Sequence, residues 1–448
     1  MKNGVILLSS ILFYSFGAPK FIFVILASTI IDFYLVNALH KSEAPKKRKR
    51  LLILSLTLNL SLLAYFKYAN FFVENVNSFL GEMGFHSVEW TSVALPIGIS
   101  FYTFQTLTYS VDVYRKSHAP LKKLSDYLLY ILSFPQMIAG PIVRFTTIAD
   151  QITNRAETAD DKLLGFFRFC IGLGKKVLIA NVLGEQASLL MEGDIASLST
   201  SAAWVGIVAY TFQIYFDFSG YSDMAIGLGR MMGFTFPENF NSPYTSRSIT
   251  EFWRRWHMTL SSFMRDYLYI PLGGNKVKSQ SRLYVNLWIV FLLSGLWHGA
   301  SWNFILWGAF HGFFLVIERL FFGHFLKRIG KIPALLITFF ITLQGWVIFK
   351  LENVSDIPVY FGKLFSFHEG TVPFNMNSDF IPILAVAVFF SLLTLFKFGQ
   401  RMEAKLIFSA SLSLRGYVAY SLVAAVLLLL SGATIITSDF NPFIYFRF

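Results

Sequence analysis

Long uncharged stretches divide this chain, and their number limits the folds open to it. The first covers residues 3–18 and the last residues 416–438, while residues 21–37 are equally apolar apart from Asp32. Most of them approach the roughly 20 residues that cross a bilayer as a helix. The other uncharged stretches are 51–66, 91–111, 127–143, 195–216, 332–349 and 380–396.

The composition supports a membrane location. Hydrophobic residues make up 55% of the 448 residues and charged residues only 14%, whereas a soluble domain has about 25% charged residues. No cleavage pattern of small residues follows the first stretch, so we expect it to be retained. We predict an all-α polytopic membrane protein, one domain over residues 1–448, with ten or eleven hydrophobic segments, short interfacial helices and an aromatic tail at 439–448.

The charges predict an orientation. The formal net charge is +12, but the basic residues occupy short loops such as 40–50, which holds six Lys and Arg, so they indicate membrane topology and not nucleic-acid binding. The segment 73–90 has three Glu and neither Lys nor Arg. This alternation predicts a multi-pass membrane protein, in contact with lipids, with its N-terminus in the cytoplasm and its C-terminus outside. The single cysteine, Cys170, rules out an internal disulfide and a cysteine-based metal cluster, and we expect no metal and no bound cofactor.

The most informative stretch is 283–317, which has no Asp, Glu, Lys or Arg over 35 residues. As one helix it would be about 52 Å long, more than the roughly 30 Å of a hydrocarbon core. We predict a break within 294–301, where Gly295 and Gly299 flank His298. An ionisable ring inside a membrane segment is a candidate for function, although a packing hydrogen bond would also explain it. For His311, thirteen residues on, an interhelical hydrogen bond is the favoured interpretation.

A second group of polar residues precedes this stretch. Ser248 and Glu251 have the spacing of a capping box, and residues 252–260 have the pattern of an interfacial amphipathic helix. His257 falls on its aromatic side, which would point it inward, but beside two arginines a solvated surface histidine is the favoured interpretation from the residues alone. Arg265 and Asp266 are predicted to form an ion pair. Upstream, Asp217 and Asp223 border a membrane segment and are expected to pair with Arg254 and Arg255.

Several motifs occur in one order and span nearly the whole chain. They are Leu-Pro-Ile-Gly-Ile-Ser-Phe-Tyr-Thr-Phe-Gln at 95–105, Gln-Met-Ile-Ala-Gly-Pro-Ile-Val-Arg at 136–144, Phe-Asp-Phe-Ser-Gly-Tyr-Ser-Asp at 216–223, Phe-Trp-Arg-Arg-Trp-His at 252–257, Arg-Asp-Tyr at 265–267, Pro-Leu-Gly-Gly at 271–274 and Gly-Leu-Trp-His-Gly at 295–299. Together they resemble the membrane-bound O-acyltransferase (MBOAT) family, above all the bacterial branch with alginate and peptidoglycan O-acetyltransferase membrane subunits. The resemblance implies a location in a bacterial cytoplasmic (inner) membrane.

The resemblance implies a helical fold with a central tunnel, which donor and acceptor enter from opposite faces. It also implies that His298 is the catalytic residue and that His257 is the second polar residue of the site. The residues predicted to support this pair are Trp297, Arg265, Asp266, Asp217 and His311. Neutral imidazole is the usual base near pH 7, so we predict that His298 is a general base and that His257 orients it or polarises the acyl carbonyl.

The C-terminal residues 443–448 resemble the Phe-x-Tyr-Phe-x-Phe motif of bacterial envelope acylation systems, in which the tyrosine carries the acyl group as an ester. Tyr445 is therefore predicted to be an acyl relay that His298 activates. An aromatic anchor at the membrane interface is the alternative.

The predicted function is transfer of acetyl groups from cytoplasmic acetyl-CoA across the membrane, for O-acetylation of an extracytoplasmic polysaccharide. Delivery is either direct or through an extracytoplasmic acyltransferase partner. One alternative is transfer of D-alanine from an acyl carrier protein to teichoic acid. The other is a transporter or proton-coupled flippase that uses His298 and His257 as a proton relay. The acceptor polymer and the oligomeric state stay open.

Overall fold

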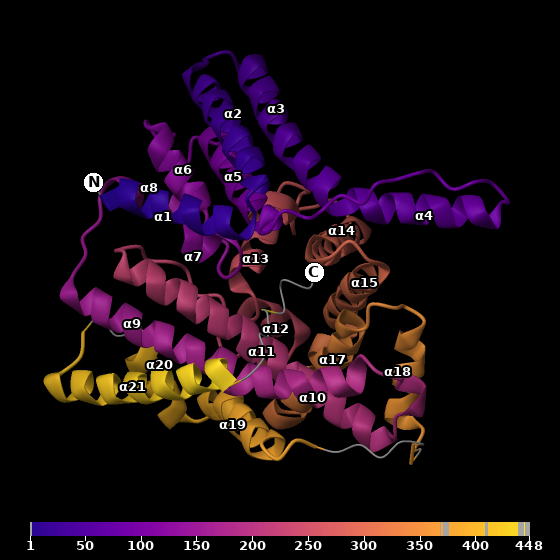
Figure 1. Ribbon diagram of the computed structural model, residues 1–448. Helices are drawn as coiled ribbons and strands as arrows, with labels where there is room; N and C mark the ends of the chain where they lie inside the picture. Colours follow the sequence, from indigo (N-terminus) through magenta and orange to yellow (C-terminus); the bar gives the residue numbers. More distant parts are fainter. Residues whose placement is uncertain (1, 368, 371–375, 408–410, 438–442, 444–448) are drawn as a thin grey trace. The chain divides into compact units, whose positions relative to one another are not determined.

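The computed structural model describes residues 2–367, 369–370, 376–407, 411–437 and 443 (Figure 1). Every regular element in these ranges is helical, as predicted. The chain forms two compact units, one of residues 1–158 with 232–237 and one of residues 159–231 with 238–448. The grouping of all 448 residues into one domain stays a prediction.

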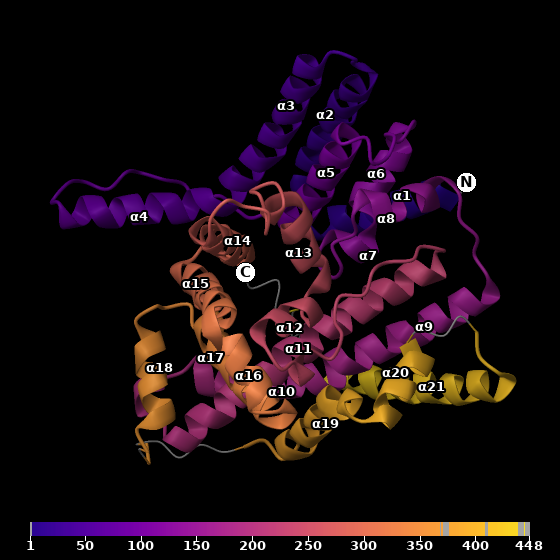
Figure 2. The ribbon, with the colours of Figure 1, turned by 180° about the vertical axis from the view of Figure 1, so that it is seen from behind.

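The first unit contains an antiparallel pair of long helices, α2 and α3, which lie side by side in both ribbon views (Figures 1 and 2). A buried polar cluster, described in the Discussion, joins this pair to two further helices of the unit. The elements of the unit are α1 (Lys2–Gly17), α2 (Phe21–Lys41), α3 (Pro45–Leu63), η1 (Ala64–Tyr68), α4 (Ala69–Glu82), α5 (Ile99–Tyr114), α6 (Leu124–Leu132), α7 (Phe134–Met137) and α8 (Phe145–Thr153).

Two of the uncharged stretches in this unit are not continuous helices. In the stretch 91–111 the helix begins only at Ile99, because Gly98 adopts a left-handed conformation with φ 76°. The stretch 127–143 divides between α6 and α7 and continues without helix to residue 143. Pro135 lies in the first turn of α7, where proline is tolerated, and the left-handed Gly140 (φ 97°) lies in the non-helical part that follows.

The second unit is built around α11, a helix of 32 residues with α9 and α10 packed along it. Its core is rich in large aromatic side chains, among them the fully buried Trp307 and Trp346. Its elements are α9 (Ala159–Gly174), η2 (Lys175–Ala180), α10 (Asn181–Met191), η3 (Ile195–Ser197), α11 (Thr200–Met231), η4 (Pro243–Thr245), α12 (Ile249–Arg255), α13 (Met258–Phe263), η5 (Met264–Tyr269), α14 (Gln280–His298), α15 (Trp302–Ile317), η6 (Glu318–Phe322), α16 (Gly323–Arg328), α17 (Lys331–Lys350), α18 (Asp356–Phe365), α19 (Phe380–Leu392), η7 (Leu393–Leu395), α20 (Lys397–Ile407) and α21 (Leu414–Thr437).

Among the described residues, five helical stretches are long and apolar enough to cross a membrane, and six if a bent pair counts as one span. The five are Phe21–Lys41, Pro45–Glu82, Trp302–Arg328, Lys331–Lys350 and Leu414–Thr437, and the bent pair is Phe380–Leu395 with Lys397–Lys405. Ten or eleven hydrophobic segments therefore stay a prediction.

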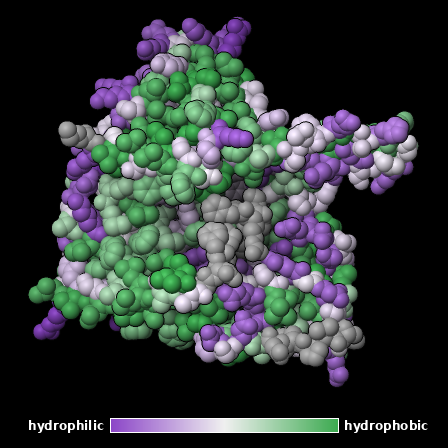
Figure 3. Space-filling view, in the orientation of Figure 1, coloured by the Kyte–Doolittle hydropathy of each residue, from purple (hydrophilic) through white to green (hydrophobic). Residues whose placement is uncertain are grey.

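The surface also has the character of a membrane protein. Figure 3 shows apolar side chains over the lengths of α2 and α3, and hydrophilic residues at the end where residues 40–50 connect them. On α21, Leu429 is 73% exposed and Ile436 is 85% exposed. Apolar surface of this extent suits contact with lipid tails.

Candidate active site

The predicted break in the stretch 283–317 is confirmed, since α14 ends at His298 and α15 begins at Trp302. The two helices pack backbone against backbone through small residues. A Cβ atom on Gly295 would lie 2.2 Å from the carbonyl oxygen of Phe304, and one on Gly308 would lie 2.3 Å from that of Phe291. Such close packing is typical of glycine-containing membrane helices, and it holds the His298 turn in the interior.

His298 is buried, with 6% of its surface exposed. Aromatic rings surround its imidazole: the ring centroids lie 5.0 Å from Trp297, 5.0 Å from Trp307 and 5.4 Å from Phe349. The planes of all three rings make angles of 75° to 88° with the plane of the imidazole. Aromatic rings favour this edge-to-face arrangement. His298 therefore lies in an aromatic pocket at a helix end.

His257 lies at a break that the sequence did not predict. The expected continuous helix over 252–260 is wrong, because α12 ends at Arg255, Trp256 is extended, and α13 begins at Met258. His257 itself is left-handed, with φ 43° and ψ 53°. A non-glycine residue in this region costs of the order of 1–3 kcal/mol. Contacts with the rest of the unit must therefore hold His257 in place.

The non-helical segment 239–241 supplies these contacts. The backbone N–H of Asn241 donates to the carbonyl of Arg255 (2.9 Å), and that of Met258 donates to the carbonyl of Asn239 (2.9 Å). Asn239 is fully buried, and its side-chain oxygen lies 2.9 Å from Nδ1 of His257. The sequence analysis missed Asn239, because an asparagine outside a periodic segment carries no signal that it contacts a residue eighteen positions away.

The two predicted catalytic histidines lie close together. The ring centroids of His257 and His298 are 6.5 Å apart, and Trp297 lies 5.9 Å from His257. His257 is fully buried, so the solvated surface position favoured from the residues alone is wrong, and burial lowers its pKa to about 3. Desolvation disfavours the charged imidazolium, so His257 is neutral at pH 7.

His311 belongs to the same aromatic group. Its ring centroid lies 5.0 Å from Trp253 and 5.1 Å from Trp307, and Trp307 in turn contacts His298. The predicted interhelical hydrogen bond is wrong, since neither ring nitrogen of His311 has a hydrogen-bond partner among the described residues. The ring instead packs against Gly345 of α17 and the tryptophans.

The other predicted supporting residues are not all near the histidines. Arg265 and Asp266 form the predicted ion pair at 2.6 Å, but the Arg265 side chain is 62% exposed. Asp217 is buried and pairs with Lys176, and Asp223 pairs with Arg168 and Lys175. The expected pairing of these acids with Arg254 and Arg255 is therefore wrong, because the neighbouring α9 and η2 supply their partners.

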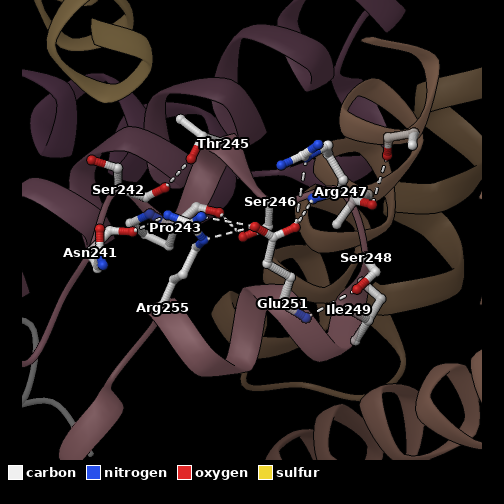
Figure 4. A network of polar contacts seen from close by, with 12 residues as sticks. Asn241, Ser242, Pro243, Thr245, Ser246, Arg247, Ser248, Ile249, Glu251 and Arg255 are labelled. Carbon is white, nitrogen blue, oxygen red and sulfur yellow. Dashed lines mark hydrogen bonds and ion pairs between the residues drawn. The ribbon is translucent and has the colours of Figure 1, made fainter. Parts of the chain in front are cut away.

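The start of α12 is capped much as predicted (Figure 4). The hydroxyl of Ser248 accepts a hydrogen bond from the backbone N–H of Glu251 at 3.1 Å. The reciprocal bond differs, since Glu251 Oε2 accepts from the backbone of Arg247 at 2.9 Å and Oε1 binds the Arg255 guanidinium at 2.8 Å. Glu251 thus binds residues at both ends of α12, the helix that precedes His257.

A cavity of about 520 Å³ lies beside this cap. Four basic side chains from separate segments line it: Arg247 before α12, Arg319 of η6, Lys327 of α16 and Lys331 at the start of α17. Two acids in its wall are already engaged, because Glu251 binds Arg255 and Glu318 accepts from the backbone N–H groups of Ile249 (2.7 Å) and Thr250 (3.1 Å). The cavity is thus suited to an anionic group.

Tyr445 lies outside the described residues. Phe443, two residues earlier, is described, and its ring centroid lies 4.3 Å from Tyr221 and 4.8 Å from Nζ of Lys176. Three residues before Tyr221 on α11, Phe218 packs against His257 with ring centroids 4.7 Å apart. Residues three apart on a helix are neighbours, so Phe443 contacts the turn of α11 next to His257.

These observations define a class of protein: a helical membrane protein with two buried histidines at helix breaks. Residues 48–353 match the model of the membrane-bound O-acyltransferase family, MBOAT. The chain belongs to this family and is an acyltransferase. The transporter alternative is therefore not supported. In the part of the chain that the structure describes, no group of three or more His, Cys, Asp or Glu could hold a metal ion.

Among similar proteins, "Probable alginate O-acetylase AlgI" of Pseudomonas aeruginosa is 43% identical over 367 residues, covering 82% of this chain and 70% of its own. The peptidoglycan O-acetyltransferase of Helicobacter pylori is 39% identical over 383 residues, covering 78% of this chain and 71% of its own. The teichoic acid D-alanyltransferase of Streptococcus thermophilus is 32% identical over 238 residues, covering 50% of this chain and 56% of its own.

Proposed function

We propose that this acyltransferase moves acetyl groups from cytoplasmic acetyl-CoA across a bacterial inner membrane to an extracytoplasmic polysaccharide. The observation that carries the proposal is the buried pair of His257 and His298, 6.5 Å apart in an aromatic pocket. The names of the alginate and peptidoglycan relatives support acetyl as the acyl group and a polysaccharide as the final acceptor.

In the proposed reaction His298 is the general base. Its neutral imidazole takes the proton of an acceptor hydroxyl, and the oxygen attacks the carbonyl carbon of the thioester. The carbon–sulfur bond breaks, the imidazolium returns the proton to the leaving thiolate, and an ester is formed. The aromatic pocket excludes water, which protects the thioester from hydrolysis.

The basic cavity supports a donor that carries phosphate. Arg247, Arg319, Lys327 and Lys331 surround a space of about 520 Å³, and guanidinium and ammonium groups are the usual protein partners of phosphate. Two helices connect this cavity with the histidines. α12 begins at the cavity and ends two residues before His257, and α15 begins near His298 and ends at Ile317, next to Glu318 of the cavity wall. A phosphate bound there would place a flexible thioester arm along these helices.

Tyr445 is proposed as the first acceptor. His298 would remove its phenolic proton, the acetyl group would pass to the phenol oxygen, and a polysaccharide hydroxyl or an outer acyltransferase partner would then take it and release the phenol. The contact of Phe443 with Tyr221, one helical turn from the residue that packs on His257, supports this step. Tyr445 follows Phe443 by two residues in the sequence.

The test uses the purified protein in proteoliposomes with radiolabelled acetyl-CoA. We expect label on a C-terminal peptide, with mass spectrometry placing the acetyl group on Tyr445. The Tyr445→Phe variant should not be labelled there and should not deliver acetyl to polysaccharide. Normal delivery by this variant would contradict the relay, and a wild type that forms no acetyl ester would contradict the whole function.

Transfer of D-alanine is the second candidate, favoured by the similarity to the Streptococcus thermophilus D-alanyltransferase. The same proteoliposomes, supplied with a D-alanyl carrier protein, distinguish the two. D-alanyl ester formation in place of acetyl ester formation would support this candidate and would leave the proposed roles of His298 and Tyr445 intact.

A further inference from the structure

The side chain of Asn239 makes contacts that determine which nitrogen of His257 carries the proton. Its amide oxygen lies 2.8 Å from the hydroxyl of Thr259, 2.9 Å from Nδ1 of His257 and 3.4 Å from the backbone nitrogen of Thr259. Its amide nitrogen donates to the hydroxyl of Ser222 at 3.1 Å. All four groups are buried.

The backbone N–H of Thr259 fixes the orientation of this amide. A backbone N–H can only donate, so the Asn239 atom that faces it must be the oxygen and not the NH₂ group. A carbonyl oxygen can only accept, and the ring nitrogen at 2.9 Å must therefore be protonated. In a neutral imidazole the proton on Nδ1 leaves a lone pair on Nε2.

The backbone of Asn239 also helps to hold His257 in place. The carbonyl of Asn239 accepts from Met258, the residue after His257, so Asn239 binds both the side chain of His257 and the chain that follows it. His257 is left-handed at φ 43°, and these bonds offset the cost of that conformation. One residue thereby sets both the position of the ring and its tautomer.

We propose that Asn239 is a positioning residue that holds His257 as the Nδ1–H tautomer, so that Nε2 is the unprotonated nitrogen of the ring. The inference rests on the proposed function in assigning His257 to the reaction site. It favours one of the two roles considered for His257: a neutral ring of this tautomer has no N–H on Nε2 and cannot polarise an acyl carbonyl. It can accept a hydrogen bond or a proton, and so orient His298 or a hydroxyl.

The surrounding charges bear on any test by pH. His298 faces His257 from α14. On α11, Asp223 follows Ser222 and is paired with Arg168 of α9 and Lys175 of η2, while Glu238 precedes Asn239 and also binds Arg168. Glu403 of α20 lines the small cavity beside this ion cluster. The substitutions below leave these groups in place.

The first experiment measures the tautomer in the whole wild-type protein. Nitrogen NMR of histidine-labelled protein separates protonated from unprotonated ring nitrogens, and a His257→Gln sample identifies the signals of His257. We expect a protonated Nδ1 and an unprotonated Nε2 at neutral pH. The opposite tautomer would overturn the inference, and this result does not depend on whether the protein transfers acetyl groups.

The second experiment compares Asn239→Ala and Asn239→Asp with a matched control, Asn241→Ala. Asn241 lies in the same segment but is exposed, and its contacts with Arg255 use backbone atoms. Outer groups that orient a functional histidine typically contribute 10–100-fold to activity. We expect Asn239→Ala to lower kcat by about that factor with little change in KM, and Asn241→Ala to stay within about twofold of wild type.

Asn239→Asp separates positioning from mere packing. Its carboxylate keeps an acceptor beside Nδ1 and adds a negative charge, which stabilises imidazolium and raises the pKa of His257. Because the proposed role needs the neutral ring, the acid side of the kcat profile should move to higher pH. An unchanged profile with wild-type kcat in both Asn239 variants would overturn the inference, and should Asn239→Ala not fold, Asn239→Asp and the NMR measurement still decide it.

Discussion

Each of the two units contains a buried ionisable group in an apolar segment, but the surroundings of the two groups differ. In the first unit, Asp32 of α2 is fully buried and accepts hydrogen bonds from four side chains of α3, α5 and α6. In the second unit, His298 is enclosed mainly by aromatic rings. The donors to Asp32 are Ser55, Asn59 at 3.2 Å, Ser110 at 3.4 Å and Tyr127 at 2.6 Å.

The difference teaches how to separate structure from chemistry among buried charges. A carboxylate whose oxygens are occupied by neighbouring donors joins helices together and has little capacity left for a substrate. An imidazole between rings at a helix break, 6.5 Å from a second imidazole, is a group that can exchange protons near pH 7. We therefore expect Asp32 to contribute to stability and His298 to activity.

The largest effect is expected at His298. His298→Ala should lower acyl transfer about 1,000-fold, because general base catalysis typically contributes 10²–10⁴-fold. Transfer is measured with labelled donor in proteoliposomes, and thermal unfolding in detergent serves as the control for folding. If the variant instead unfolds at a lower temperature and retains its rate per folded molecule, His298 would contribute to stability and not to activity, which is the role expected of Asp32.

Asp32→Ala should act in the opposite way. It leaves buried hydroxyl and amide donors without their acceptor, at a cost of about 1–3 kcal/mol in the free energy of unfolding. The midpoint of thermal unfolding should fall, while the rate per folded molecule should stay near wild type. Glu43→Ala, at an exposed carboxylate in the same unit, is the matched control and should change neither quantity. Loss of activity without loss of stability would assign Asp32 to the reaction.

A smaller effect is expected at the basic cavity. Replacement of both Lys327 and Lys331 by Gln should raise KM for acetyl-CoA about 5–10-fold and leave kcat unchanged, because two charged partners of phosphate are lost. Added salt should weaken wild-type binding more than that of the variant. The control is the pair Lys46→Gln and Lys49→Gln, two exposed lysines in the first turns of α3. An equal rise in KM in the control would mean that net charge, and not the cavity, attracts the donor.

The smallest effect is expected at Arg265, which the resemblance implicates in the site. Its side chain is 62% exposed and its ion pair with Asp266 lies at the surface, so Arg265→Ala should change the free energy of unfolding by less than about 1 kcal/mol. Activity should stay within about twofold. A tenfold loss of kcat would show that this pair does belong with the histidines.

Much of the fold could be read from local patterns. Apolar stretches of suitable length became helices in α2, α17 and α21, because a single segment that must satisfy its own backbone hydrogen bonds in lipid has few other options. The break in the stretch 283–317 was predicted from the length of that stretch, which as one helix exceeds the thickness of the hydrocarbon core. Where glycine or proline interrupts a stretch, as at Gly98 and Pro135, composition predicted a span and the local backbone did not form one.

The candidate site was predictable only in part. His298 and His257 stand out as ionisable residues in apolar or aromatic surroundings, and the structure places them together. The break at His257, its left-handed backbone and its bond to Asn239 depend on a segment eighteen residues away in sequence. No periodicity or motif spacing specifies such a contact.

The sequence by itself determined that this chain forms apolar helices and that a histidine lies at a break between two of them, because helix length and hydrophobicity are local properties. Only the tertiary structure decided which groups surround that histidine. The left-handed turn at His257, the amide of Asn239 that bonds its ring, and the pairing of Asp217 with Lys176 all arise where distant segments pack. Packing and hydrogen bonding between such segments are set by the whole fold and not by the neighbours of a residue along the chain.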